Sequence, residues 1–368
     1  MNHATTPPPP VYPVRPPGRI PPQRNKRPRR RWIRRLALAL CITTLLAAGI
    51  GTALYLRLDT NIHSLDLKGA LGSDRPAPGT GENILLLGSD TRAGDNARYA
   101  GGKEQTGRSD VAMVLHLAPD RRSAQLVSIP RDTLIDRPQC TTADGATVPA
   151  ARGVMFNTAF AVGGPLCSVK TAESVSGLRI DHVISIDFAG FARAVDALGG
   201  VDITVSRPIK DTYSGLDIPA GTSHLNGKQA LAFTRTRHGV GDGSDLGRIT
   251  LEQQMIAAIL TKAKTTGLLT SPVRLFRMAD ALTSSITTDS ALASVKDLVD
   301  FGKDLKALDQ RNVTMVTLPV RPAPTDHNRV VPRQPQARAL WHALKSGQPI
   351  PASVKAVQRP DPATEKTR

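Results

Sequence analysis

The sequence predicts an α/β fold, in which a central mixed β-sheet is covered by helices (α/β/α), preceded by one N-terminal transmembrane helix. Two observations predict this fold. Short apolar or alternating runs that suit strands recur between longer segments that suit helices. One long segment near the N-terminus holds no charged residue. At 368 residues the chain is long enough to bury a sizeable core.

The N-terminal 35 residues differ in composition from the rest of the chain. Residues 1–35 hold ten Lys or Arg and no Asp or Glu, and residues 1–28 hold ten of the 29 prolines. We therefore expect a disordered, basic cytoplasmic tail over residues 1–35. Because these ten charges account for much of the formal net charge of +17, the remainder is only modestly basic. The high pI therefore does not indicate a nucleic-acid-binding protein.

Residues 36–56 form the charge-free segment, whose length suits one crossing of a bilayer by a helix. Several arginines precede this segment, and charge is sparse just after it. The positive-inside rule then places the N-terminus in the cytoplasm and the chain after residue 57 outside the cell membrane. A cleaved signal peptide is the alternative, although its apolar core would be shorter. We expect a single-pass anchor with an extracellular domain.

The rest of the chain divides by composition into three parts. We expect a polar stem over residues 57–82, an extracytoplasmic domain over 83–346 and a flexible tail over 347–368. In the domain, the runs predicted as strands are Asn83–Leu87, Val111–Leu117, Ser123–Ile129, Asp181–Asp187, Val201–Val205 and Asn312–Leu318. The segments predicted as helices are Phe188–Leu198, Gly227–Thr234, Leu246–Lys264, 272–286 and 291–305.

The three cysteines fall in two settings. Cys41 lies in the predicted membrane helix, as a small apolar residue. Cys140 and Cys167 both lie in the outer part, where an oxidising compartment permits a disulfide. Two separate buried thiols are the alternative. We predict that Cys140 and Cys167 are bonded, with Cα atoms within about 7 Å of each other.

Charged residues gather where the predicted strands and helices begin and end, which is where open α/β sheets bind ligands. A guanidinium group can donate two parallel hydrogen bonds to phosphate oxygens, and carboxylate oxygens are suitable ligands for Mg²⁺. Together they suggest a bound diphosphate and a divalent cation, which is what phosphoryl transfer requires. For any single arginine, a surface salt bridge is the alternative. The group comprises Asp90, Arg92, Arg108, Asp110, Arg131, Arg235, Arg237, Asp245 and Arg248.

The order of the motifs is more specific than their composition. The sequence resembles the LytR-CpsA-Psr family of cell-wall glycopolymer ligases over about residues 82 to 265. The matching stretches are NILLLGSDTR (83–92), GRSDVAMVLHL (107–117), VSIPRDTLI (127–135), FNTAFAVGG (156–164), DALGGVDITV (196–205), LNGKQALAFTRTRHG (225–239) and DLGRITLEQQ (245–254). No zinc-hydrolase HExxH, Walker or GxSxG motif is present.

The resemblance implies a Mg²⁺- (or Mn²⁺-) dependent phosphotransferase that moves a glycopolymer from a polyprenyl-pyrophosphate carrier to peptidoglycan. It implies that Asp90 and Asp110 hold the metal, and that Asp245 and Arg237 are catalytic. Asp245 would orient the arginines or assist deprotonation of the acceptor. The arginines implied around the pyrophosphate are Arg92, Arg108, Arg131, Arg235, Arg237 and Arg248. The family's lipid tunnel would be lined by apolar faces of Phe188–Leu198 and Met255–Leu260.

Three residues of this sequence differ from the motifs that are common in the family, and two other functions are alternatives to the transferase. Met155 stands where the family often has a basic residue, and Leu251 and Glu252 replace a common Arg-Gln pair. The alternatives are a non-enzymatic polyprenyl-pyrophosphate-binding or regulatory protein and a lipid pyrophosphatase. A paired Asp set among arginines favours the enzyme, because a binding protein could dispense with the metal.

Two structural predictions follow from these interpretations. The carboxylates of Asp90 and Asp110 should face one another across a gap that fits one Mg²⁺. The helix before Arg235 should end at Phe233 or Thr234, so that residues 235–237 run extended and both guanidinium groups reach one ligand.

Overall fold

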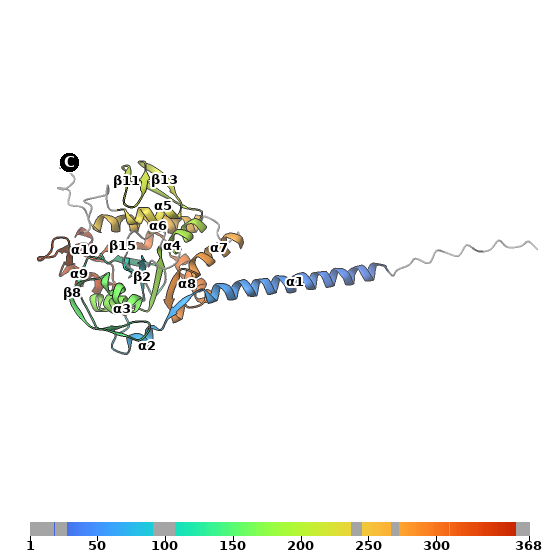
Figure 1. Ribbon diagram of the computed structural model, residues 1–368, viewed down its shortest axis with the longest axis horizontal. Coiled ribbons are helices and arrows are strands. Elements are labelled where there is room, and N and C mark those ends of the chain that lie inside the picture. Colours follow the sequence, from blue (N-terminus) through green and yellow to red (C-terminus); the bar gives the residue numbers. More distant parts are fainter. Residues whose placement is uncertain are drawn as a thin grey trace, which may run out of the picture. The chain divides into compact units, whose positions relative to one another are not determined.

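A computed structural model gives the structure of the chain and describes Gly18 and residues 28–90, 107–236, 245–265, 272–308 and 310–357. The chain divides into two compact units, Met1–Leu54 and Tyr55–Arg368. The first unit contains most of α1 (Pro28–Thr60), and the second contains the sheet and the other helices (Figure 1).

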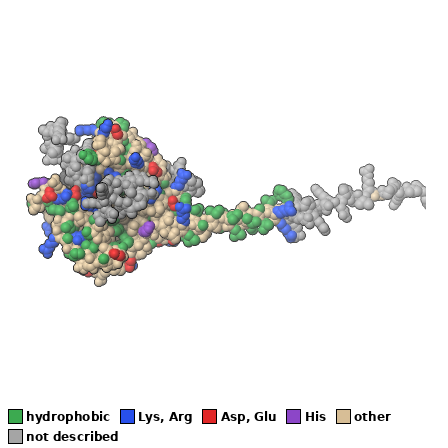
Figure 2. All heavy atoms as spheres, viewed as in Figure 1, with side chains coloured by type: hydrophobic (Ala, Val, Ile, Leu, Met, Phe, Trp, Pro, Cys, Tyr) green, Lys and Arg blue, Asp and Glu red, His purple; other side chains and the backbone are tan. Residues whose placement is uncertain are grey.

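Helix α1 contains the predicted membrane segment. Its stretch Trp32–Thr60 is long and apolar enough to cross a membrane. Hydrophobic side chains cover the helix, and basic ones gather at its N-terminal end (Figure 2). The helix begins within the tail predicted to be disordered and runs past Leu56 to Thr60. Arginine is a good helix former, so the basic flank extends the helix instead of ending it.

The described residues form a central seven-stranded sheet in the order β1-β14-β9-β2-β3-β4-β15. Strand β2 is parallel to β9 and antiparallel to β3, β3 is antiparallel to β4, and β4 is parallel to β15. The carboxyl ends of β2, β4, β9 and β15 therefore lie at one edge of the sheet, together with the amino end of β3. We call this the carboxyl edge. The strands span β1 His63–Leu65, β2 Glu82–Ser89, β3 Ser109–Leu117, β4 Ala124–Ser128, β9 His182–Asp187, β14 Ile286–Asp289 and β15 Val313–Thr317.

Helices cover both faces of the sheet, because its strands are apolar on both sides. Leu85 and Leu87 of β2 belong to a core shared with α3 (Thr158–Ser176), α9 (Gln336–Lys345) and α10 (Ala352–Val357). Ile84, one residue along and therefore on the other face, belongs to a core shared with α8 (Val295–Ala307). The predicted α/β/α architecture is confirmed.

A second layer of helices packs beside this sheet and carries two hairpins. It comprises α4 (Phe188–Ala197), α5 (Gly227–Arg235), α6 (Asp245–Thr265) and α7 (Pro272–Thr283) (Figure 1). The hairpins pair β10 (Val201–Val205) with β13 (Gly221–Leu225) and β11 (Ile209–Asp211) with β12 (Leu216–Ile218). The strand predicted at Val201–Val205 therefore exists, but it lies outside the central sheet.

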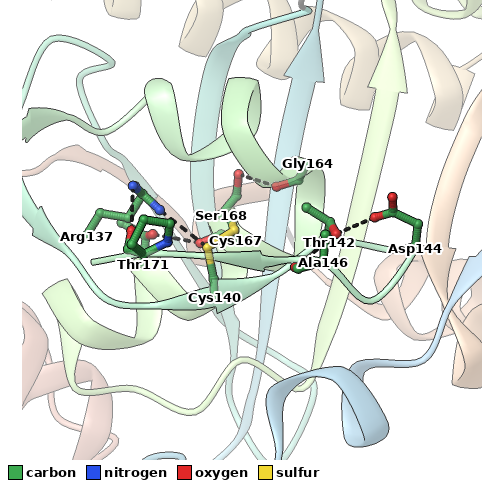
Figure 3. Close-up of a disulfide and its surroundings, with 10 residues drawn as sticks. Arg137, Cys140, Thr142, Asp144, Ala146, Gly164, Cys167, Ser168 and Thr171 are labelled. Carbon is green, nitrogen blue, oxygen red and sulfur yellow. Dashed lines mark hydrogen bonds between the residues drawn. A yellow bond between two sulfur atoms is a disulfide. The ribbon is translucent and has the colours of Figure 1, made fainter. Parts of the chain in front are cut away.

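The predicted disulfide between Cys140 and Cys167 is present, with a Cα–Cα distance of 5.2 Å. It ties the hairpin of β6 (Cys140–Thr141) and β7 (Thr147–Val148) to α3 (Figure 3). A Cβ on Gly163 would lie 2.0 Å from the Cys167 sulfur, so the disulfide requires glycine there. The remaining short strands are β5 (Leu134–Arg137), β8 (Ala151–Met155), β16 (Val320–Pro322) and β17 (Val330–Pro332).

The predicted stem and the predicted C-terminal tail both contribute side chains to the core of the domain. The stem contributes β1 to the sheet and α2 (Leu67–Leu71), whose Leu67 and Leu71 are buried in the core. In the tail expected from residue 347, Ile350 and Val354 are buried in the same core. Both segments were bounded by their polar, Gly- and Pro-containing composition, which does not show that a few apolar side chains in each of them reach the core.

The helices differ from the predictions in several places. The helix expected over 291–305 is α8, which begins at Val295 and ends at Ala307. The helix expected over 272–286 ends at Thr283, and Ile286 begins β14, which pairs with β9. Helix α3 was not predicted, because its sequence contains Gly163, Gly164 and Pro165, and the two glycines are non-helical. Pro165 removes a donor but begins the turn after this kink, a position that tolerates proline.

Candidate functional site

The candidate site is built at the carboxyl edge, where a β-bulge separates two of the predicted acidic residues. Gly88 pairs with Val111 and Ser89 pairs with Ser109, so Asp110 is the extra residue of β3. A bulge re-aims the side chain of such a residue and often lies beside a functional site. Just beyond it, the Asp90 N–H donates to the Arg108 carbonyl at 3.0 Å, and the Arg108 N–H donates to the Asp90 carboxylate.

Arg131 reaches Asp110 from the neighbouring strand. Strand β4 runs antiparallel to β3, and the Ile129 N–H donates to the Ala112 carbonyl at 2.8 Å, so the chain after β4 passes beside the bulge. There the Arg131 guanidinium donates to Oδ1 of Asp110. The Asp110 side chain is 23% exposed and that of Arg131 is 13% exposed.

Arg248 approaches the same bulge from the first turn of α6. Its Nη2 donates to the Asp110 backbone carbonyl at 2.6 Å, and its Nη1 lies 3.9 Å from Oδ1 of Asp110. Its Nε lies 3.0 Å from Oε1 of Glu252, one turn further along the helix. Both side chains are buried, so each charge is stabilised by the other. Three contacts thus fix the guanidinium of Arg248.

Arg235 enters the site from the end of α5. Its guanidinium carbon lies 5.1 Å from the centre of the Phe188 ring, at the start of α4, which is a cation–π distance. The helix ends at Arg235, slightly later than predicted, because Thr236 prolongs the last turn by donating from Oγ1 to the Ala232 carbonyl at 2.9 Å. Thr236 is extended, as predicted. Arg237 lies outside the described residues.

The turn between β11 and β12 completes the site. Asp211 is buried, and its Oδ1 accepts from the Tyr213 and Ser214 N–H groups at 2.9 and 3.4 Å. The hydroxyls of Ser214 and Thr236 are 2.9 Å apart, which joins this turn to the end of α5.

These elements enclose a cavity of about 290 Å³. Its wall holds two of the predicted arginines and one of the predicted aspartates, with aromatic rings on two further elements. The residues that line it are Asp110, Val111, Phe188, Asp211, Tyr213, Ser214, Thr234, Arg235, Arg248 and Glu252.

The sequence profile of the LytR_cpsA_psr family matches residues 56–346. The chain belongs to the LytR-CpsA-Psr family. The chain is 30% identical over 305 residues to the cell wall biosynthesis protein LcpA of Corynebacterium glutamicum, which covers 76% of this chain and 58% of that protein. It is 37% identical over 180 residues to the polyisoprenyl-teichoic acid–peptidoglycan teichoic acid transferase TagU of Bacillus mycoides, covering 49% of this chain and 52% of that one. The chain thus spans a little over half the length of these relatives.

Solved structures agree with the fold. A LytR-Csp2A-Psr enzyme from Actinomyces oris aligns with a TM-score of 0.57 and 25% identity, over 77% of this chain and 96% of its own. TagT bound to LI-WTA aligns with a TM-score of 0.54 and 22% identity, over 76% of this chain and 97% of its own. The LytR-CpsA-Psr fold therefore matches the sheet and helices described above.

The site of this LytR-CpsA-Psr protein brings together part of the predicted set. Asp110, Arg235 and Arg248 line the cavity, and Arg131 contacts Asp110. Asp90 and Arg108 are joined at the end of the next strand by a backbone hydrogen bond and by one from the Arg108 N–H to the Asp90 carboxylate. Asp245 is the first residue of α6, but its side chain is not described. Arg92 and Arg237 lie outside the described residues.

Oxygen donors for a divalent cation come from two adjacent strands. Among the described residues, no group of three or more His, Cys, Asp and Glu could hold a metal. Asp90 and Asp110 offer only a pair of carboxylates, flanking the Ser89–Ser109 pair. Such a pair fits Mg²⁺, which is commonly bound through one or two carboxylates and completed by water and substrate phosphates. The roles predicted for Asp90 and Asp110 stay predictions.

Sequence analysis missed or underused three cavity residues. Glu252 was noted only as a departure from a common family motif, although its spacing from Arg248 places both on one face of α6. Phe188 was expected to line a lipid tunnel, whereas its ring lies beside Arg235. Tyr213 carried no signal, because its turn is brought to the cavity only by the packing of the hairpin.

Some of the apolar side chains of α4 and α6 that were expected to line a lipid tunnel are instead buried in a hydrophobic core. Val195 of α4 and Met255 of α6 are buried in one cluster with Leu251 and Phe233. Leu251, the second departure from the family motif, therefore acts as a core residue here.

Proposed function

We propose that this protein transfers a glycopolymer from a polyprenyl-pyrophosphate carrier to peptidoglycan. The observation that supports it most is the cavity at the carboxyl edge, whose wall includes the guanidinium groups of Arg235 and Arg248. Arg131 donates a hydrogen bond to the carboxylate of Asp110, which lines the cavity. Arginines grouped around a cavity suit a pyrophosphate, because each keeps its charge and offers a fork of N–H donors. The TagU relative is named for a transfer between these two kinds of molecule.

The reaction requires one bond to form and one to break at phosphorus. A hydroxyl of the wall glycan attacks the phosphorus next to the transferred glycopolymer, and polyprenyl phosphate leaves with the electrons of the broken P–O bond. The hydroxyl proton passes to a base, and we propose Asp245 for this role. Arg235, Arg237 and Arg248 stabilise the charge on the phosphate oxygens. Arg248 is held in place by its contacts with Asp110 and Glu252, so it needs little reorganisation.

Asp90 and Asp110 are the residues proposed to hold Mg²⁺ or Mn²⁺. When bound, the ion would neutralise charge on the pyrophosphate oxygens. Asp110 has a partly exposed carboxylate in the cavity wall, and Arg131 shares that carboxylate through Oδ1. Loss of Asp110 would therefore disturb both a metal ligand and the position of Arg131.

We propose that α1 anchors the protein, with the basic N-terminal flank in the cytoplasm and the LytR-CpsA-Psr domain outside the cell. The apolar stretch and the arginines before it support this orientation. Protease added to intact spheroplasts should digest the domain and leave the N-terminal tail protected. Digestion of the tail instead would reverse the orientation.

Transfer can be measured with the full chain in liposomes that contain a prenyl-pyrophosphate-linked oligosaccharide, with peptidoglycan fragments and Mg²⁺ added. We expect polyprenyl phosphate to appear together with glycan attached to peptidoglycan, and EDTA to stop both. Asp110→Asn should lower the rate by on the order of 10²–10³. The exposed Arg321 lies outside the cavity wall, so Arg321→Ala is the matched control.

Two results would contradict the proposal. Release of polyprenyl phosphate without glycan attachment would identify a lipid pyrophosphatase. Tight binding of the donor without release of either product would identify a binding protein.

A further inference from the structure

Tyr213 combines an anchored backbone with an exposed ring. Its side chain is 85% exposed, more than any other large apolar side chain among the described residues. Scattered apolar side chains are common on protein surfaces, so exposure by itself indicates nothing. What sets Tyr213 apart is its place in the wall of the cavity that also contains Arg235 and Arg248.

The turn that carries Tyr213 is built to hold its position. The buried carboxylate of Asp211 accepts the Tyr213 N–H at 2.9 Å. Ile209, Leu216 and Ile218, which flank the turn, are buried in the core beneath it. Because the backbone at Tyr213 is already fixed, a ligand that covers the ring has to order only its two side-chain torsions.

The same turn is fixed relative to the arginines. Ser214, next to Tyr213, lies 2.9 Å from Thr236 between hydroxyl oxygens. Thr236 directly follows Arg235 at the end of α5. The backbone that carries Tyr213 is therefore held close to the end of α5, where Arg235 lies.

We propose that the Tyr213 ring is a stacking platform for the first sugar of the donor glycan, the pyranose ring attached to the pyrophosphate. This inference rests on the proposed function, in which the pyrophosphate lies among the arginines. The first sugar is bonded directly to that pyrophosphate, so it must lie at the cavity wall. A pyranose ring presents a face of C–H groups, which suits the electron-rich face of an aromatic ring. Tyrosine supplies a large, rigid contact with a hydroxyl at its rim, and so binds amphipathic ligands well.

The test compares two probes on the full chain in detergent: a prenyl pyrophosphate without sugar, and the same prenyl pyrophosphate carrying an N-acetylglucosamine disaccharide. We expect Tyr213→Ala to raise the Kd of the sugar-bearing probe about tenfold and to leave that of the sugar-free probe within about twofold. Tyr213→Phe and Tyr213→Trp should stay close to the wild type, because they keep the ring. Val299→Ala removes another exposed apolar side chain, on α8, and should change neither Kd.

The outcomes separate the inference from the function on which it rests. An equal loss for both probes, or no loss for either, would overturn the platform while the wild type still bound prenyl pyrophosphate. A wild-type protein that bound neither probe would overturn the proposed function and the platform with it. Because Tyr213 is exposed, its substitution leaves the core intact, and an unchanged Tm for each variant would exclude misfolding.

Discussion

Each end of the central sheet has a charged cluster, and the two clusters are built differently: one joins the amino ends of β2 and β9, and the other lies at the carboxyl edge. At the amino ends of these two strands, His182 lies between two carboxylates: Nε2 is 2.6 Å from Oε1 of Glu82, and Nδ1 is 3.1 Å from Oδ1 of Asp289. At the carboxyl edge, Asp110 and the arginines border a cavity of about 290 Å³. One end ties strands together, and the other leaves room for a ligand.

In the amino-end cluster, the pKa of the base is raised and the pKa values of both acids are lowered, as expected for oppositely charged groups in contact. Burial opposes the charged form of His182, but hydrogen bonds to Asp289 and Glu82 outweigh it and raise its pKa to about 9. The hydrogen bond from His182 lowers the pKa of Glu82. Burial opposes ionisation of Asp289, but the hydrogen bond from His182 still holds its pKa below the ordinary value. At neutral pH the cluster is therefore an ion pair network that joins β2, β9 and β14.

The comparison shows that a cluster of charged residues at the end of a sheet does not by itself indicate a ligand-binding site. Both ends combine acids and bases from adjacent strands. In the part of the chain that the structure describes, the carboxyl edge also has a cavity, a bulge that re-aims an acid, and a cation held from a helix. Charges that meet a ligand should therefore affect activity, and charges that meet only each other should affect stability.

The largest expected effect is on activity at the carboxyl edge. The double variant Arg235→Ala/Arg237→Ala should lower the transfer rate by on the order of 10²–10³ or more, because charge-assisted contacts in the transition state are lost. Measurement of transfer in liposomes, with circular dichroism to verify folding, tests this. Near-normal transfer by the folded double variant would show that both arginines serve only in salt bridges, and the comparison would fail.

At the opposite end, His182→Ala should leave transfer per folded molecule nearly unchanged but destabilise the domain. The buried Asp289 and the partly exposed Glu82 would lose their shared cation. We expect a cost of about 2–3 kcal/mol, less than the roughly 3–5 kcal/mol of a fully buried pair, because of this partial exposure. Thermal unfolding of the full chain measures the change. His224 forms a similar pair with Asp202, but both side chains are more than half exposed, so His224→Ala should have little effect. Equal effects of the two variants would mean that the His182 cluster is not a buried network.

Stability should also depend on pH through His182. Its pKa is about 9 in the folded state against an ordinary 6.5, so its contribution is full below about pH 6.5 and is lost as pH rises towards 9. The pKa values of Glu82 and Asp289 are lowered, so their contributions are present above about pH 4.5 and are lost as pH falls through their folded values. Tm should therefore decline between pH 6.5 and 9. The decline should be smaller in His182→Ala, and an identical decline would refute this assignment.

The smallest expected effect comes from Glu252, an acid within the cationic site. Glu252→Gln keeps an oxygen for Arg248 but removes a negative charge from the cavity wall. Binding of prenyl pyrophosphate should tighten by about three- to fivefold, since repulsion of an anion is relieved. Asp217→Asn, on the exposed side of β12, is the control. Weaker binding in Glu252→Gln would show that its charge is needed to position Arg248.

Much of the fold was predictable because local patterns report local backbone preferences. The apolar runs at 83–87 and 111–117 form β2 and β3, and the helix expected at 246–264 is α6 within one residue at each end. Composition could not show that the stem and the C-terminal segment join the core, because their buried apolar residues are too few to form a pattern. These residues are Leu67, Leu71, Ile350 and Val354.

The sequence by itself determined five of the seven central strands, helices α4 to α8, the apolar N-terminal segment and the ordered set of aspartates and arginines. Only the tertiary structure decided which of these residues meet. Asp110 contacts Arg248 across 138 positions of the chain, and Tyr213 reaches the cavity through a hairpin outside the central sheet. The physical reason is that strand order and helix packing set such contacts. These depend on the burial of many side chains at once, whereas sequence periodicity reports only how each segment folds locally.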